Sequence, residues 1–107
     1  MEVTDTQKLL RLCKTALENH YGTQLAGLLV YGSVARQQAA TTSDIDLLVL
    51  LRQPFDYFAE LRQVIEVLYP IQLESDNLIS AKPVLSDEFE RGSLQLYRNA
   101  KHEGVLV

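Results

Sequence analysis

The sequence predicts a single α/β domain, and three observations lead to that prediction. The chain has 107 residues, which is enough for one domain around one core. Hydrophobic residues make up 47% of it and charged residues 22%, the balance of a folded globular protein. Apolar residues recur first at helical spacing and then in short continuous runs, so helices and strands alternate along the chain. We therefore expect one α/β (or α+β) domain over residues 1–107.

The first half of the chain is expected to contain two helices and two strands. Apolar residues at helical spacing predict a helix over residues 6–20, which Gly22 ends. The run over residues 25–31 predicts a buried strand, and a short helix is expected over residues 33–38. A second strand is expected over residues 44–51; because it is apolar after Asp46, it should be central in its sheet.

The second half of the chain continues the alternation. Apolar residues three or four apart predict an amphipathic helix over residues 55–68, and Pro70 is expected to stop it. Extended residues, including a third strand, are expected within residues 71–85. Helical residues follow from 86, with a break at Gly92, and residues 105–107 are expected to be extended.

Charge and composition exclude several classes of function. The net charge is −4, so the chain lacks the basic character of a protein that grips nucleic acid strongly. The single cysteine, Cys13, excludes an intrachain disulfide and is expected on a buried helix face. The N-terminus is acidic and polar, unlike a signal peptide, and no apolar run approaches the ~20 residues of a membrane span. A cytoplasmic protein without membrane contact is expected.

The segment from Gly32 to Asp46 carries the clearest functional pattern. Gly32 and Ser33 follow one apolar run, and Asp44 and Asp46 open the next. Side chains two apart on a strand point to the same face, so the two aspartates should face one spot. Adjacent carboxylates repel each other unless a cation lies between them, and a Gly-Ser turn offers backbone N–H groups and a hydroxyl to phosphate. The pattern predicts a divalent metal beside a polyphosphate.

Each of these residues also has an ordinary structural interpretation. Gly32 alone fits a turn after a strand, and Ser33 fits a helix N-cap. Arg36 follows Ser33 by about one helical turn and would reach the same phosphates, or would be a surface arginine. In the structural interpretation, Asp44 would have a helix-cap or turn role and Asp46 would form an ion pair. Aspartate is a poor strand former, so two of them at the mouth of a central strand favour the functional interpretation.

The order Gly32-Ser33-x-Ala35-Arg36, seven residues, then Asp44-x-Asp46 resembles the signature of the nucleotidyltransferase fold shared with DNA polymerase beta. Within that superfamily the chain is most similar to the minimal nucleotidyltransferases, short proteins often encoded beside a helical HEPN-domain partner. The resemblance implies a small mixed central sheet flanked by helices. It implies that Asp44 and Asp46 hold Mg²⁺, while Gly32, Ser33 and Arg36 bind the phosphates of ATP or another nucleoside triphosphate.

A third carboxylate, from a neighbouring strand, completes the site in that superfamily and serves the attacking hydroxyl. Its place here is not obvious in the sequence. The best match by context, Ile71-Gln72-Leu73, has glutamine where the acid is expected, and residues 78–85 contain no acid. Asp76 is the preferred candidate for this catalytic role, followed by Glu74.

The resemblance implies transfer of AMP, or another nucleoside monophosphate, to a hydroxyl group. The expected acceptor is a tyrosine on a HEPN-type toxin, which the chain would silence as an antitoxin. A second hypothesis is a non-catalytic antitoxin that keeps the fold and neutralises its partner by binding alone. A third is a nucleotidyltransferase acting on a small molecule, with an acceptor pocket completed by dimerisation. Both homo- and hetero-oligomers remain compatible with the sequence.

Overall fold

The computed structural model describes residues 5–31 and 44–107. The helices of these ranges are α1 (Asp5–Tyr21), α2 (Tyr57–Leu73), α3 (Ser86–Arg91) and α4 (Gln95–Glu103), with a 3-10 turn, η1 (Gly22–Gln24). The strands are β1 (Leu25–Tyr31), β2 (Ile45–Leu51), β3 (Ile79–Leu85) and β4 (Val105–Leu106). The helix expected over residues 33–38 lies outside the described residues, as do Gly32, Ser33 and Arg36.

The described strands form one mixed sheet in the order β3-β2-β1-β4. β2 pairs parallel with β3 and antiparallel with β1, and β4 pairs antiparallel with β1. The central position predicted for β2 is confirmed, because the strand has a hydrogen-bonded neighbour on each side. Gly22 has φ 58°, the left-handed conformation that commonly follows the last turn of a helix, so the predicted end of α1 is confirmed as well.

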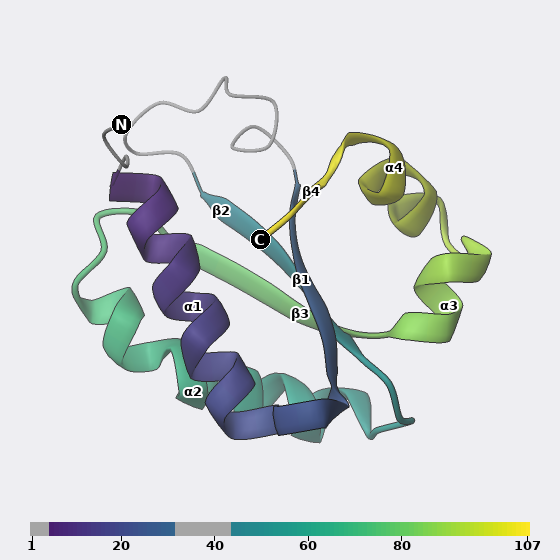
Figure 1. The fold of residues 1–107 in the computed structure, drawn as a ribbon, viewed down its shortest axis with the longest axis horizontal. Coiled ribbons are helices and arrows are strands. Elements are labelled where there is room, and N and C mark those ends of the chain that lie inside the picture. The colour runs from purple at the N-terminus through teal and green to yellow at the C-terminus, as the bar shows by residue number, and fades with distance from the viewer. Residues whose placement is uncertain (1–4, 32–43) are drawn as a thin grey trace.

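Helices cover both faces of the sheet, α1 and α2 on one face and α3 and α4 on the other (Figure 1). The larger cluster joins α1 and α2 to alternate residues of the central strands, and it includes Cys13, Leu17, Leu47 and Val64. The burial of Cys13 confirms the buried position predicted for this thiol. Such alternation is what the two-residue period of a strand requires when both faces are covered.

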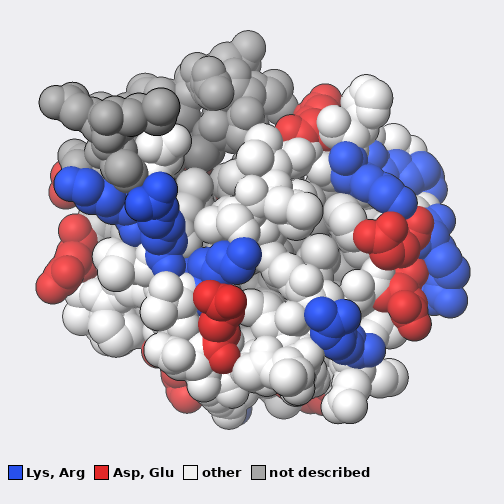
Figure 2. Space-filling view, viewed as in Figure 1, with Lys and Arg blue, Asp and Glu red and all other residues white. Residues whose placement is uncertain are grey.

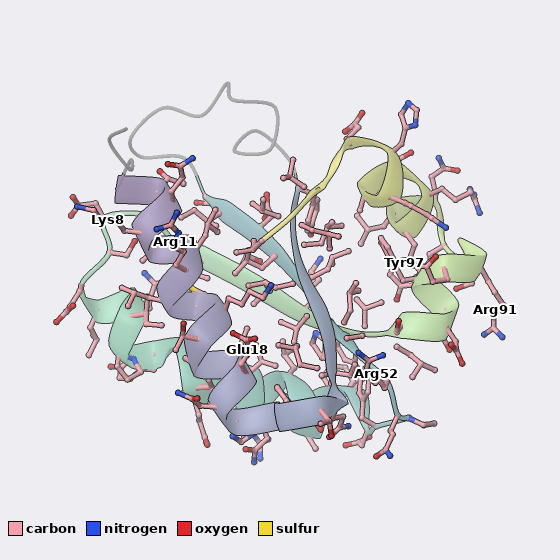
Figure 3. The ribbon with its side chains drawn as sticks, viewed as in Figure 1. Lys8, Arg11, Glu18, Arg52, Arg91 and Tyr97 are labelled. Atoms are coloured by element: carbon pink, nitrogen blue, oxygen red, sulfur yellow. The ribbon has the colours of Figure 1, made fainter. Side chains whose placement is uncertain are left out.

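The smaller cluster lies between the sheet and the α3–α4 pair. It contains Leu29, Leu48 and Phe89 among its buried members, with Tyr97 packed against it. Tyr97 extends from α4 toward α3, and its ring centroid lies 6.2 Å from that of Phe89 (Figure 3). The α3–α4 pair is therefore fastened to the sheet by apolar and aromatic contact.

The end predicted for the helix over residues 55–68 is wrong. α2 continues through Pro70 to Leu73, so residues 71–73 are helical and the extended residues expected there begin only at Ile79. Proline in a helix removes one N–H donor and crowds the preceding turn. Here Pro70 lies in the last turn, and Ile71 packs against the larger cluster. Burial of Ile71 offsets the lost hydrogen bond, and α2 therefore extends one turn further.

Gln72 links the end of α2 to the start of β3. Its side-chain Nε2 donates to the carbonyl oxygen of Asn77 at 2.9 Å, and its Oε1 accepts from the backbone N–H of Ile79 at 2.6 Å. A glutamine offers both a donor and an acceptor, which this bridge uses. Gln72 thus has a structural role at the edge of the sheet where β2 and β3 begin.

Candidate functional site

The two predicted metal ligands lie at the N-terminal end of the central strand. Asp44 directly precedes β2 and is exposed, and Asp46 is the second residue of β2 and is half-buried. The neighbours of Asp46 in the chain, Ile45 and Leu47, point into the larger cluster. Strand alternation therefore directs Asp46 to the opposite face, toward α3 and α4. The start of β2 presents carboxylates on one face and core on the other.

Electrostatics shows that the two carboxylates interact. Burial raises the pKa of Asp46 above its ordinary value, and the negative charge of Asp44 raises it further. The positive charge of Lys82 opposes both effects. Like charges close together raise the pKa because each disfavours ionisation of the other, and a bound cation relieves that repulsion. Two carboxylates held near each other are hard oxygen donors suited to Mg²⁺.

The strand pairing identifies the neighbours of Asp46, which the sequence analysis missed. Asp46 pairs with Tyr31 of β1 on one side and with Ser80 of β3 on the other. Burial raises the pKa of Tyr31, and the charge of Asp46 adds to the effect. Ser80 and Lys82 share the face of Asp46, because residues directly opposite on paired strands point the same way. Tyr31 stands directly before Gly32 in the chain, but Ser80 and Lys82 become neighbours of Asp46 only through the register of β2 with β3.

The predicted third carboxylate, Asp76, lies in the turn between α2 and β3 and is exposed. Glu74 is the C-cap of α2 and is also exposed. This turn lies at the same edge of the sheet as the start of β2, since the N–H of Ile45 donates to the carbonyl oxygen of Leu78 at 2.8 Å. However, no three Asp, Glu, His or Cys side chains in residues 5–31 and 44–107 gather closely enough to hold a metal ion. Asp76 as third carboxylate stays a prediction.

The predicted phosphate-binding residues follow β1 in the chain. Gly32 comes directly after Tyr31, the last residue of β1, and Tyr31 pairs with Asp46. The described ends of β1, β2 and β3 therefore bring Tyr31, Asp46 and Ser80 to one edge of the sheet. That edge is where a Gly-Ser turn after β1 would have to act if it shares a ligand with the two aspartates.

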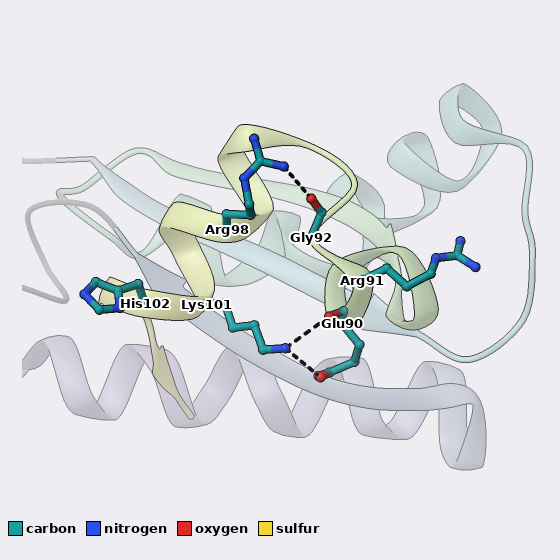
Figure 4. Close-up of a pocket in the computed structure, with 6 residues that line it drawn as sticks. All are labelled: Glu90, Arg91, Gly92, Arg98, Lys101 and His102. Atoms are coloured by element: carbon teal, nitrogen blue, oxygen red, sulfur yellow. Dashed lines mark hydrogen bonds and ion pairs between the residues drawn. The ribbon is translucent and has the colours of Figure 1, made fainter.

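A pocket of about 330 Å³ lies between α3 and α4, away from the predicted site residues. Figure 4 shows that two of its cationic side chains, Lys101 and Arg98, bind the protein itself. Lys101 Nζ donates to the carbonyl oxygen and to a side-chain oxygen of Glu90, both at 3.1 Å. Arg98 donates to the carbonyl oxygen of Gly92 at 2.7 Å. These contacts hold α4 against the end of α3, which is a structural use of the charges.

The face of the molecule shown in Figure 2 carries charges of both signs. On the face shown in Figure 2, lysine and arginine are interspersed with aspartate and glutamate rather than gathered into a continuous basic surface. A basic patch or stripe is the usual footprint of a protein that binds a phosphate backbone.

Among the described helices, none is both long and apolar enough to cross a bilayer.

Fold and candidate site together define a class of protein: an α/β domain with a pair of carboxylates at the start of its central strand. Comparison with known proteins gives the family. Residues 12–102 match the family described as polymerase beta, nucleotidyltransferase. The match spans most of the chain, so the chain belongs to the polymerase beta nucleotidyltransferase family. Among proteins with curated descriptions, none matches the sequence.

The fold is shared with solved structures, including the following two. One is a protein from Sulfolobus solfataricus described as a candidate nucleotidyltransferase, with a TM-score of 0.56 and 21% identity, covering 92% of this chain and 78% of that one. The other is a toxin–antitoxin structure with AMP-PNP, with a TM-score of 0.55 and 18% identity, covering 96% of this chain and 72% of that one. The nucleotidyltransferase fold predicted from the sequence is confirmed, with its mixed sheet flanked by helices.

Proposed function

We propose that this protein is a Mg²⁺-dependent nucleotidyltransferase that moves AMP, or another nucleoside monophosphate, from a nucleoside triphosphate to a hydroxyl group. The observation that carries the proposal is the interacting pair Asp44 and Asp46 at the start of the central strand of a nucleotidyltransferase domain. Their oxygens would hold Mg²⁺, which supplies positive charge to the phosphate oxygens of the donor. The similar toxin–antitoxin structure with AMP-PNP supports ATP as the donor.

The other residues of the proposed site orient the donor and the acceptor. Gly32 and Ser33 would bind the outer phosphates through backbone N–H groups and a hydroxyl, with Arg36 as a further contact. The acceptor oxygen attacks the α-phosphorus of the donor. The bond between the α-phosphorus and the oxygen that bridges it to the β-phosphorus breaks, and pyrophosphate leaves. The proton of the acceptor passes to a base, which we assign to Asp76 on the turn before β3.

We propose a tyrosine on a HEPN-type helical toxin as the acceptor, and an antitoxin role for this chain in the cytoplasm. The support is the similarity to a toxin–antitoxin structure together with the small size of the domain. A tyrosine hydroxyl on a second protein would be delivered to the edge of the sheet where β2 begins. Modification of the toxin would then silence it.

One observation favours a second function, neutralisation of the toxin by binding alone. The residue paired with Asp46 on β3 is Ser80, which cannot act as a carboxylate base. A site with only two of three carboxylates would bind a nucleotide without activating the acceptor. The chain would then be a non-catalytic antitoxin that keeps the nucleotidyltransferase fold.

The test is incubation with α-labelled ATP, Mg²⁺ and the helical partner. Label on the partner with wild type, lost with Asp44→Asn plus Asp46→Asn and kept with Asp87→Asn, supports the transferase. Asp87 is a matched control, because it is an exposed aspartate in the first turn of α3. Equal inhibition of the toxin by wild type and double variant, without label transfer, would establish the binding function. Label on a small molecule but not on the partner would establish a nucleotidyltransferase that acts on small molecules.

A further inference from the structure

The outer face of α2 carries a row of large apolar side chains that the described domain leaves in solvent. Phe58 is 74% exposed, Ile65 55%, Tyr69 56% and Leu73 67%. At 100° per residue this row is centred roughly 115° around the helix from the buried residues Val64 and Leu68. Single exposed apolar residues are ordinary, whereas four on one helix face, with Arg62 between the first two, mark a surface that another protein covers.

The spacing of this row is that of a helix that packs against another helix. Phe58, Arg62, Ile65 and Tyr69 are separated by four, three and four residues, which is the alternation of the core positions in a coiled coil. A row of this kind wraps around α2 slowly enough to stay in contact with a second helix over several turns. The surface is therefore built for a helical occupant rather than for a flat one.

We propose that the occupant is the α2 helix of a second copy of this chain, packed antiparallel around a two-fold axis near residue 64. That arrangement places Phe58 against the partner's Tyr69, so the two ends of the row form aromatic pairs. It also places Arg62 opposite the partner's Glu66, and the two-fold axis repeats that ion pair. Both residues are exposed in the single chain. The row is complementary to itself in shape and in charge.

The size of the surface predicts the strength of the dimer. Around an axis near residue 64 the two helices overlap from Phe58 to Tyr69, about 17 Å at 1.5 Å per residue, and the contact is one helix wide. Such an area belongs with small, transient interfaces, so we expect a dissociation constant in the micromolar range. The proposal does not depend on the transferase function, because α2 covers the face of the sheet opposite to Asp46.

The test is sedimentation equilibrium of the full chain over a concentration series that reaches roughly 100 µM, where a micromolar dimer is populated. Wild type should dimerise, and Ile65→Glu should be monomeric at every concentration. Leu94→Glu is the matched control: Leu94 is 54% exposed, close to the 55% of Ile65, but lies at the start of α4. It should dimerise like wild type. Circular dichroism and urea titration check that each variant is folded.

Charge reversal gives a second measurement that does not add a charge to an apolar position. Arg62→Glu and Glu66→Arg should each weaken the dimer, by roughly two- to thirty-fold for two exposed ion pairs. The two changes combined in one chain should restore it, because the two-fold axis pairs them again. A wild type that stays monomeric overturns the proposal, as does failure of the combined variant to recover. If Ile65→Glu instead abolishes binding of the helical toxin to a monomeric wild type, the occupant is that toxin and not a second copy.

Discussion

The two faces of the central strand β2 differ in what they give to the molecule. Toward α1 and α2 the strand presents an unbroken apolar row, each member at most 1% exposed: Ile45, Leu47, Val49 and Leu51. Toward α3 and α4 it presents the buried Leu48 and Leu50, but the position nearest the start of the strand is Asp46. The face toward α1 and α2 stabilises the fold, whereas the other face begins with the charged side chain of Asp46. The four changes below break or sharpen this contrast, from the largest expected effect to the smallest.

Truncation on the apolar face should have the largest effect. Leu47→Ala removes a fully buried side chain between the sheet and the helices α1 and α2. We expect the free energy of unfolding to fall by about 2–5 kcal/mol, because transfer free energy is lost and a cavity remains. Urea unfolding measures the change. Leu47→Met, which keeps the volume, should cost less than about 1.5 kcal/mol. Similar losses for the two variants would show that this face does not depend on packing.

The apolar face is also the part of the fold that the sequence predicts best. Strands β1 and β2 follow from continuous apolar runs, and α1 follows from helical spacing, because burial on a covered sheet leaves no room for polar side chains. The end of α2 was not predictable from local rules. Pro70 argues for a stop, but the packing of Ile71 on the core and the bridge from Gln72 to β3 extend the helix.

The site was predictable only in part for a similar reason. Asp44 and Asp46 stand out because charges interrupt an apolar strand. Ser80 and Lys82 carry no such local signal, and they become neighbours of Asp46 only through the parallel register of β2 with β3. That register is set by the α2 crossover and by Gln72, which are tertiary features. Sequence spacing alone therefore singles out Asp44 and Asp46 but not the residues that lie beside them.

A polar contact at the rim of the apolar face should have an intermediate effect. The Tyr21 hydroxyl donates to a carboxylate oxygen of Glu60 at 2.6 Å, which joins the end of α1 to the first turn of α2. Tyr21→Phe should lower the free energy of unfolding by about 1–2 kcal/mol, which is between the values for a neutral hydrogen bond and for a bond to a fully buried charged group. Tyr69→Phe, at an exposed position on α2, is the control for urea unfolding and should change it little. An equal loss in both variants would contradict a specific role for this bond.

Added charge on the other face should have a smaller effect that depends on metal. Ser80→Asp places a third carboxylate directly opposite Asp46. Like charges opposite each other on paired strands cost about 0.2–1 kcal/mol, so the variant should be less stable than wild type without Mg²⁺. If this edge holds the metal, Mg²⁺ should raise the melting temperature of the variant more than that of wild type.

Ser80→Asn is the control for that measurement, since asparagine has the shape of aspartate without its charge. It should respond to Mg²⁺ as wild type does. A melting temperature of Ser80→Asp that is insensitive to Mg²⁺ would show that Asp44, Asp46 and the start of β3 do not share a metal. Shape alone would explain the change if both variants were destabilised equally.

The smallest effect on stability is expected from removing the negative charge of Asp46. Asp46→Asn keeps the shape of the side chain while removing a carboxylate whose pKa is raised by burial and by Asp44. In the metal-free protein we expect a small gain in the free energy of unfolding near neutral pH, although under the proposed function the same change should abolish nucleotidyl transfer. Asp87→Asn, on the exposed first turn of α3, should give no such gain.

The pH dependence separates this charge effect from a change in packing. Because the pKa of Asp46 in the folded protein lies above its ordinary value of 3.8, the folded protein holds this proton more tightly than the unfolded chain does. Wild type therefore loses stability as the pH rises from below 3.8 through the folded pKa, whereas asparagine does not titrate. The advantage of Asp46→Asn in urea unfolding should be absent at the acidic end, grow across that interval and then stay constant. An advantage independent of pH would mean that packing, and not repulsion at the mouth of β2, sets the cost of the carboxylate.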